Sequence, residues 1–240
     1  MKTKLTLIAL AASTLVAAPA FAEGDYYCDY CDAATASVFD LQIGAFNSVD
    51  NNNVTNSASV NNKVLRDASG NIGLNVAAGS NNQQANAAAI ADAQFSFGGA
   101  AASIVAIQGS GYNNTTDGYW YDYYWYYGTT NTASMNDQAL KNVKGNVGVN
   151  IAAGDGNQQK NDLATANASN WYGYDYGDHA EASTEAYQVS WGNTTSSWDT
   201  SNTASMNDCA MKNASGNIGV NIAAGSGNQQ FNGLSLASSH

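Results

Sequence analysis

The 240-residue chain holds 19 acidic and eight basic residues, so its formal net charge is −11. Nucleic acids and anionic membrane surfaces are bound through basic patches, and this charge balance therefore excludes both as expected partners. The only proline, Pro19, lies close to the N-terminus, and the rest of the chain is rich in Asn, Gln, Ser and Gly. Because proline cannot donate a ladder hydrogen bond, a long proline-free chain of this composition favours β-stacking.

Residues 1–22 are predicted to be a signal peptide. Lys2 and Lys4 precede an apolar run from Leu5 to Ala18, and small residues ending at Ala22 form the cleavage signal. The run is too short to cross a membrane, and no later run reaches the roughly 18 apolar residues that a span needs. We therefore expect a mature chain that starts at Glu23, passes through the periplasm and has no membrane span. Its six remaining basic residues against 19 acidic ones give a charge of −13.

Three copies of one unit follow without internal insertions or deletions. They contain SGNIGLNVAAGSNNQQAN at 69–86, KGNVGVNIAAGDGNQQKN at 144–161 and SGNIGVNIAAGSGNQQFN at 215–232. We divide the mature chain into an N-terminal segment at 23–53, repeats at 54–86, 129–161 and 200–232, spacers at 87–128 and 162–199, and a tail at 233–240. A repeat of this kind predicts supersecondary units that stack on one another.

The residues alternate with period two inside each unit, which is typical of strands. Glycines punctuate the alternation, so each repeat is expected to form a strand–arc–strand–arc–strand layer. The predicted fold is all-β, with three stacked β-arc or β-solenoid layers in a cross-β, amyloid-like arrangement and aromatic-rich loops as spacers. The predicted core is the apolar row of each copy: Ile72, Leu74, Val76, Val147, Val149, Ile151, Ile218, Val220 and Ile222.

The polar positions that recur in all three copies are expected to form vertical amide ladders. A primary amide both donates and accepts, so identical amides in register satisfy one another. The predicted ladder residues are Asn71, Asn75, Gln83, Gln84, Asn146, Asn150, Gln158, Gln159, Asn217, Asn221, Gln229 and Gln230. A single unit has too few apolar side chains to fold alone, and neither end of the stack resembles a capping repeat, so we expect self-assembly through open strand edges.

The repeated motif, as in the segment from Gly145 to Gln159, closely resembles the repeats of the Fap functional-amyloid subunits of pseudomonads. The resemblance implies secretion through an outer-membrane pore and assembly into biofilm fibres, with the repeats as core, the spacers as loops and a related major or minor subunit as a further partner. The subunits of that family carry a CxxC near the C-terminus, whereas here Cys28 and Cys31 lie at the mature N-terminus. The choice between major subunit, minor subunit and nucleator therefore stays open.

The cysteines have no clear metal-binding pattern. In an oxidising compartment we expect Cys28 and Cys31 to form a local disulfide or to pair with an export partner. Cys209 replaces Lys63 and Gln138 of the other copies, so it is expected to point outward, either as an idle thiol or as an intermolecular crosslink.

The spacers hold nearly all the aromatic residues, including the run from Tyr119 to Tyr127. Exposed Tyr and Trp suit adhesion, carbohydrate stacking or lateral fibre contact, and the alternative is that the spacers pack back on the flank of the stack. Apolar alternation between Ala89 and Ile107 predicts an additional strand pair in the first spacer.

No catalytic constellation is present in the sequence. His179 and His240 are the only histidines, and a solvated loop explains Asp178, His179 and Glu181 better than a metal site does. We expect no enzyme activity, cofactor or metal. Two functions remain: a secreted structural subunit of extracellular amyloid, or a soluble β-solenoid adhesin that binds carbohydrate or surfaces through its spacers. A nucleator that templates another subunit is a third possibility.

Overall fold

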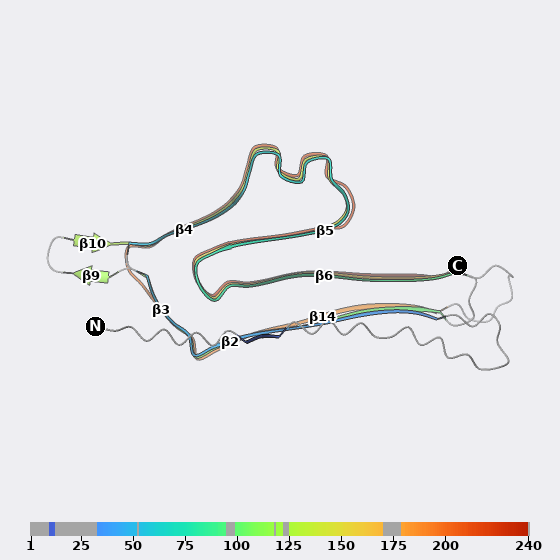
Figure 1. The fold of residues 1–240 in the computed structure, drawn as a ribbon, viewed down its shortest axis with the longest axis horizontal. Coiled ribbons are helices and arrows are strands. Elements are labelled where there is room, and N and C mark those ends of the chain that lie inside the picture. The colour runs from blue at the N-terminus through green and yellow to red at the C-terminus, as the bar shows by residue number, and fades with distance from the viewer. Residues whose placement is uncertain are drawn as a thin grey trace.

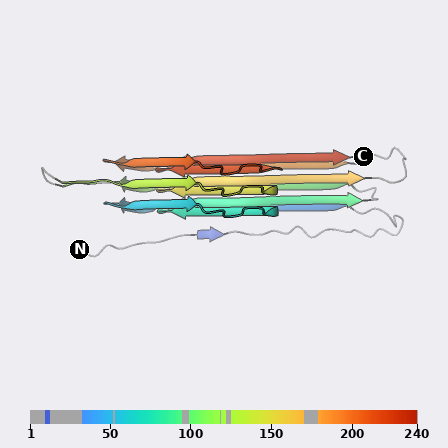
Figure 2. The ribbon, with the colours of Figure 1, turned by 90° about the horizontal axis from the view of Figure 1, so that it is seen from above.

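The computed structural model describes residues 10–12, 33–51, 53–94, 99–117, 119–121, 125–169 and 179–239. Every regular element within these ranges is a β-strand. No helix in the described part of the chain is long and apolar enough to cross a membrane. The strands form three layers that superimpose when viewed along the stack (Figure 1) and separate into three tiers when viewed from the side (Figure 2).

Each layer contains five strands. Layer 1 consists of β2 (Ala34–Ala45), β3 (Ser48–Asn51), β4 (Thr55–Val60), β5 (Ser69–Ala78) and β6 (Gln83–Gln94). Layer 2 consists of β7 (Ala100–Gly111), β8 (Asn114–Asp117), β11 (Thr130–Met135), β12 (Lys144–Ala153) and β13 (Gln158–Ser169). Layer 3 consists of β14 (Ala180–Trp191), β15 (Thr194–Ser197), β16 (Ser201–Met206), β17 (Ile218–Ala224) and β18 (Gln229–Ser239).

Equivalent strands pair in parallel and in register. β12, for example, lies between β5 and β17, with Asn150 opposite Asn75 on one side and Asn221 on the other. The same holds for the sheets β4–β11–β16 and β6–β13–β18, so layer 2 is always in the middle. The predicted all-β stack of three layers is therefore confirmed.

The layers extend beyond the sequence repeats. The spacers, expected as loops, contain strands: β7 and β8 lie in the first and β14 and β15 in the second. With β2 and β3 they form two further parallel sheets, in which Ala100 pairs with both Ala34 and Ala180. Both segments of the predicted strand pair between Ala89 and Ile107 are strands, but each pairs with its equivalents in other layers. The backbones of the five strands in one layer do not hydrogen-bond to one another. The backbone groups of the spacer strands therefore also find their hydrogen-bond partners in the adjacent layers.

The middle layer carries one insertion. Asn51 of layer 1 is in register with Asp117 at a sequence separation of 66, whereas Asn56 is in register with Asn131 at a separation of 75. Layer 2 therefore has nine extra residues between these two positions (75 − 66 = 9). They include the antiparallel hairpin of β9 (Tyr119–Tyr121) and β10 (Trp125–Tyr127), which projects from the end of the stack near β3 and β4 in Figure 1. The only other antiparallel pair in the described ranges joins β1 (Leu10–Ala12), within the predicted signal peptide, to β2.

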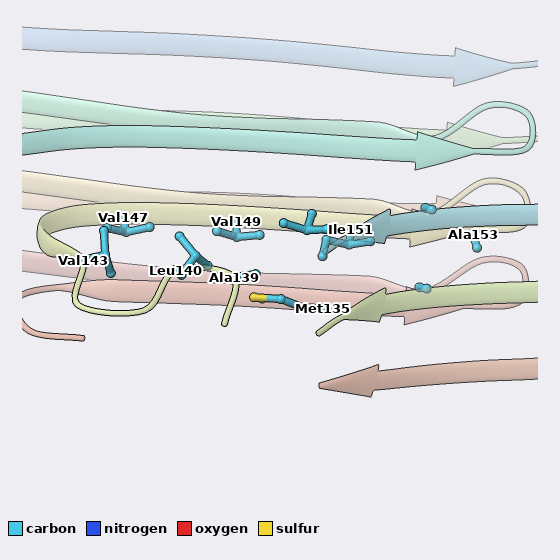
Figure 3. Packing of buried hydrophobic residues seen from close by; sticks show 11 residues of the cluster. Met135, Ala139, Leu140, Val143, Val147, Val149, Ile151 and Ala153 are labelled. Atoms are coloured by element: carbon cyan, nitrogen blue, oxygen red, sulfur yellow. The ribbon is translucent and has the colours of Figure 1, made fainter. Parts of the chain in front are cut away.

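The main apolar core lies between β4, β11 and β16 on one side and β5, β12 and β17 on the other. Val147, Val149 and Ile151 are buried in its centre, and the equivalent side chains of layers 1 and 3 are partly buried against them. The turn between the two strands adds Leu140 and Val143, both fully buried (Figure 3). These turn residues were absent from the predicted core.

The turn between the two strands has an unusual backbone. Four non-glycine residues in each copy adopt positive φ, among them Asp137, Gln138, Leu140 and Asn142 in layer 2. A left-handed conformation is uncommon outside glycine. Here the neighbouring layer stabilises it, because Leu140 N donates to Val64 O at 2.9 Å and Asn142 N donates to Lys212 O at 2.9 Å.

A second core is built almost entirely from alanine. It lies between β6, β13 and β18 and the sheet of β2, β7 and β14, and includes Ala91, Ala102, Ala166 and the fully buried Ile104. Small side chains let the two sheets approach closely in this half of the contact, where the long lower strands in Figure 1 run side by side.

We expect Leu140→Ala to destabilise the layered state by about 2–5 kcal/mol, because it removes a fully buried side chain from the central layer. The measurement is the guanidinium concentration at which assembled protein dissociates. Val64→Ala, at a 41% exposed position of the same turn in layer 1, is the matched control and should shift that concentration little.

Candidate assembly surfaces

One amide ladder runs through the stack with its layer 2 and layer 3 members, Asn150 and Asn221, buried and its layer 1 member, Asn75, exposed. Asn221 Nδ2 donates to Asn150 Oδ1 at 2.9 Å, and Asn150 Nδ2 donates to Asn75 Oδ1 at 3.0 Å. The same nitrogens also donate to backbone carbonyls, Asn150 to Ala85 O at 2.9 Å and Asn221 to Lys160 O at 3.0 Å. Each of these two amides therefore makes two kinds of bond. One joins it to its equivalent in the adjacent layer and fixes the register. The other joins its strand to the next strand of the fold in that same adjacent layer.

Two glutamine ladders run beside it. Gln158 bridges Gln83 and Gln229 at 3.0 and 2.7 Å, and Gln159 bridges Gln84 and Gln230 at 2.6 and 2.7 Å. Gln158 and Gln159 are completely buried. Removing one such amide would leave its neighbours in the ladder with unmade hydrogen bonds, and each buried group left unpaired costs about 1–3 kcal/mol.

The remaining predicted ladder residues lie near the surface. Asn146 Nδ2 donates to Asn71 Oδ1 at 2.8 Å in an exposed position. Asn217 meets layer 2 through its backbone, because its carbonyl accepts from Val147 N at 2.8 Å. This ladder stabilises the stack less, since water competes for its amides.

The structure also contains ladders that were not predicted. Asn131 bridges Asn56 and Asn202, Asn157 bridges Asn82 and Asn228, and Gln108 bridges Gln42 and Gln188, all at 2.7–2.9 Å. The first two could have been found, because an asparagine recurs at each position in all three copies. The third lies in segments with a different spacing.

Each of these ladders runs in one direction. In the Asn75–Asn150–Asn221 ladder both bonds point from layer 3 toward layer 1, and in the Gln84–Gln159–Gln230 ladder both point from layer 1 toward layer 3. The outer edges of layers 1 and 3 therefore present opposite halves of the same bonds. Parallel in-register strands give the backbone the same property. The two ends of the molecule are complementary to each other.

Buried charge is concentrated in the middle layer. Lys160, Asp162, Asp155 and Asp117 all belong to layer 2 and are at most 4% exposed. Their equivalents in the outer layers are uncharged: Ala85 and Phe231, Ala87 and Gly233, Ser80 and Ser226, and Asn51 and Ser197. The two end surfaces therefore carry none of these four charged side chains. Stacking a second molecule on either end would not place any of the four next to its own equivalent.

Lys160 neutralises the charges around it. Its Nζ lies 2.7 Å from Asp40 Oδ2 in layer 1 and 3.2 Å from Asp162 Oδ1. Neither Asp162 oxygen has a hydrogen bond within the described structure. Burial raises the pKa of Asp162 from 3.8 to about 6, an effect that Lys160 reduces and Asp40 increases.

A second acidic pair lies at the arc between β12 and β13. Asn51 Nδ2 donates to Asp117 Oδ1 at 2.8 Å and to Asp155 Oδ2 at 2.5 Å, and Ser226 Oγ donates to Asp117 Oδ2 at 3.1 Å. Burial raises the pKa of Asp155, and the charge of Asp117 adds to this effect, while hydrogen bonds from Ser80 and Asn51 oppose it. One amide from layer 1 therefore links two carboxylates of layer 2.

We expect the layered state to become more stable as the pH falls from 7 to 5. Asp162 binds a proton with a pKa of about 6 when folded and 3.8 when unfolded. The folded state therefore holds more protons in this window, which adds about 1 kcal/mol at pH 5 relative to pH 7. The midpoint of guanidinium dissociation should rise accordingly. Asp162→Asn should flatten this rise, and an unchanged slope in that variant would contradict the assignment.

The cysteine predictions are tested only in part. Cys209 is exposed at the turn, as expected, and has a free thiol. Cys28 and Cys31 lie outside the described residues. In the ranges that the structure describes, no group of three or more His, Cys, Asp or Glu side chains is arranged to hold a metal ion.

Comparison with known proteins identifies the family. The model of the functional amyloid protein FapB/FapC family matches residues 33–239, a range that spans the three layers. The chain belongs to this family. It is 46% identical over 202 residues to the functional amyloid subunit FapC of Pseudomonas aeruginosa, and the match covers 80% of this chain and 54% of that protein. The chain thus spans about half the length of this relative. No solved structure matches it.

Proposed function

We propose that the protein is a structural subunit of a secreted, extracellular amyloid fibre in biofilm, and that it has no catalytic role. Layer 3 of one molecule stacks on layer 1 of the next. The observation that carries the proposal is the complementarity of the two end surfaces, which present opposite halves of the Asn75–Asn150–Asn221 and Gln84–Gln159–Gln230 ladders. The family and the relative's name support the amyloid role.

The geometry of this contact favours a fibre over a closed oligomer. It joins two different surfaces of the molecule, and such a heterologous contact produces an open filament unless the rotation closes a ring. Parallel stacking involves translation along the axis with little rotation, as the superposition of the layers in Figure 1 indicates. Each added molecule would continue the sheets and the amide ladders, and would enclose side chains of layers 1 and 3 that are now partly buried.

The proposal includes the route to the cell surface. The predicted signal peptide takes the chain to the periplasm, and an outer-membrane pore of the kind that the family resemblance implies exports it. The chain then polymerises with itself, with or without a related subunit. Polymerisation after export is compatible with the negative charge and the lack of a membrane-spanning helix in the described residues.

Incubating the purified mature chain tests the function. The proposal expects thioflavin-positive fibres with diffraction spacings of about 4.8 Å along the axis and about 10 Å across it. A stable monomer that melts cooperatively and binds a carbohydrate or a surface would contradict it and would support the β-solenoid adhesin.

A further inference from the structure

The outward face of the sheet β2–β7–β14 carries an apolar stripe. Its inward face is covered by β6, β13 and β18, and residues alternate between the two faces. The outward residues near the C-terminal ends of these strands are mainly apolar. We define the outer stripe as Phe39 and Ile43 on β2, Ile107 on β7, and Tyr187, Val189 and Trp191 on β14.

The outer stripe is exposed and continuous across the three layers. Phe39, Ile43, Tyr187, Val189 and Trp191 are 36–54% exposed. Trp191 of layer 3 lies over the glycines of layer 2: a Cβ built on Gly109 would be 3.4 Å from its ring and 3.6 Å from Ile43. Trp191 and Ile43 thus both approach Gly109 of the middle layer, and Gly109 and Gly111 leave room for the indole.

The outer stripe carries almost no charge. Its one charged member is Glu185, which lies in register with Phe39 at the margin of the stripe in layer 3 and accepts a hydrogen bond from Tyr187 Oη at 3.3 Å. Glu181 lies at the N-terminal end of β14, away from the stripe. This contrasts with a mature chain of net charge −13. A sheet face that is apolar except for one carboxylate at its margin matches another face of the same kind, because two such faces pack about 10 Å apart with little burial of charge.

The area of the stripe indicates which partner fits. From residue 39 to 45 a strand extends about 20 Å, and three layers rise about 14 Å, so one molecule offers roughly 280 Å². A stable interface needs about 800 Å² on each partner. Two single molecules would not associate through this stripe. A filament repeats it with every subunit, and about three stacked subunits would supply the required area.

We propose that the outer stripe is the docking face for a second filament of the same chain, so that filaments pair face to face through their β2–β7–β14 sheets. This inference rests on the proposed function, because only a stack presents enough surface. Single molecules stay unpaired through this face, and pairing begins once both stacks exceed a few subunits.

The test uses two variants that place a charge on the stripe, Ile43→Lys and Val189→Lys, and a control, Thr35→Lys. Thr35 is an exposed outward residue of β2 beyond the stripe. Each variant adds one charge per subunit, about 14 Å apart along a filament, which exceeds the Debye length of about 8 Å at physiological ionic strength. Elongation should therefore continue in all three.

The readout is the mass per length of fibres by electron microscopy, with thioflavin growth curves in parallel. Wild-type and Thr35→Lys fibres should have two subunits per axial rise of about 14 Å, and both stripe variants should have half that mass per length. Wild-type fibres with one subunit per rise, or stripe variants that remain paired, would overturn the inference. The inference would also be overturned if wild-type fibres were single filaments that paired only after removal of residues 23–32. In that case the chain's own N-terminal segment would cover the stripe. If the wild type formed no fibres, the proposed function would itself fail.

Discussion

Replacing Asn75, Asn150 and Asn221 together with aspartate is expected to abolish fibre growth at neutral pH. The three side chains are bonded to each other at 2.9–3.0 Å. Asn150 and Asn221 are at most 5% exposed and donate to backbone carbonyls. A carboxylate cannot donate, so at positions 150 and 221 it would face those carbonyl oxygens and its own equivalents in a buried site. Burying unpaired charges costs several kcal/mol, which corresponds to more than a 100-fold loss in elongation rate. Thioflavin kinetics with sonicated wild-type seeds measure it.

A matched control separates charge from position. Asn136 bridges Asn61 and Asn207 at 3.2 Å in a ladder that is only partly buried and is exposed at Asn207. The triple aspartate variant of that ladder should still grow, since like charges a few ångströms apart in water cost roughly 1 kcal/mol. Lowering the pH below about 4 should partly rescue the buried variant, because a protonated carboxyl can donate again. Undiminished growth of the buried variant at pH 7 would show that these amides do not lie in register in the fibre.

Replacing Lys160 with methionine is expected to destabilise the layered state by about 3–5 kcal/mol at pH 7. The ammonium group is 2.7 Å from Asp40 and 3.2 Å from Asp162, and its side chain is 1% exposed. Without it, two carboxylates remain in a buried site with no cation. Loss of side-chain volume is not the cause, because methionine has an unbranched side chain of similar length to that of lysine. The guanidinium midpoint of fibre dissociation measures the effect.

The compensating variant isolates the charge effect. Lys160→Met combined with Asp40→Asn and Asp162→Asn removes all three charges, and we expect it to recover most of the lost stability, since a neutral site avoids the desolvation of ions. If Lys160→Met alone dissociated at the same guanidinium concentration as the wild type, the buried ion cluster would not exist in the assembled protein.

The stacking itself could be predicted from the sequence because it depends on residues that recur at one spacing. Asn75, Asn150 and Asn221 occupy equivalent positions, and side chains with period two place them on the same face of their strands. An amide that must both donate and accept has few other ways to be satisfied in a dry layer. The repeat was therefore sufficient to predict the order of the layers and their register.

The sequence predicted strands in the first spacer but not the outer sheet that they join, because the signal for that pairing is weaker and offset. Gln42, Gln108 and Gln188 are in register, but their sequence separations of 66 and 80 differ from the 75 and 71 of the repeats. The nine-residue hairpin insertion in layer 2 causes both offsets, because 75 − 66 and 80 − 71 each equal nine. The strands β2, β7 and β14 also differ from one another in most of their outward residues, because no other strand of the same layer packs against that face. Alanines at matching inward positions were the remaining signal.

The ion cluster was unpredictable for a different reason. Lys160, Asp162 and Asp155 each occur in one copy only, so they looked like tolerated variation within a polar loop or strand. Their burial follows from belonging to the middle layer, which is covered on both sides. In layers 1 and 3 the same positions would be half-open in a single molecule. Turn residues such as Leu140 were missed because the period-two alternation does not extend into the turn, where several non-glycine residues adopt positive φ.

The axial rise per subunit in fibres of the mature chain is the most direct test of the account. If layer 3 of each molecule stacks on layer 1 of the next, helical reconstruction by electron cryo-microscopy will show a rise of about 14 Å per subunit, made of three rungs about 4.8 Å apart. A rise of about 4.8 Å per subunit would mean that each molecule occupies a single rung, with its three copies side by side. That result would contradict both the layered molecule and the complementarity of its ends.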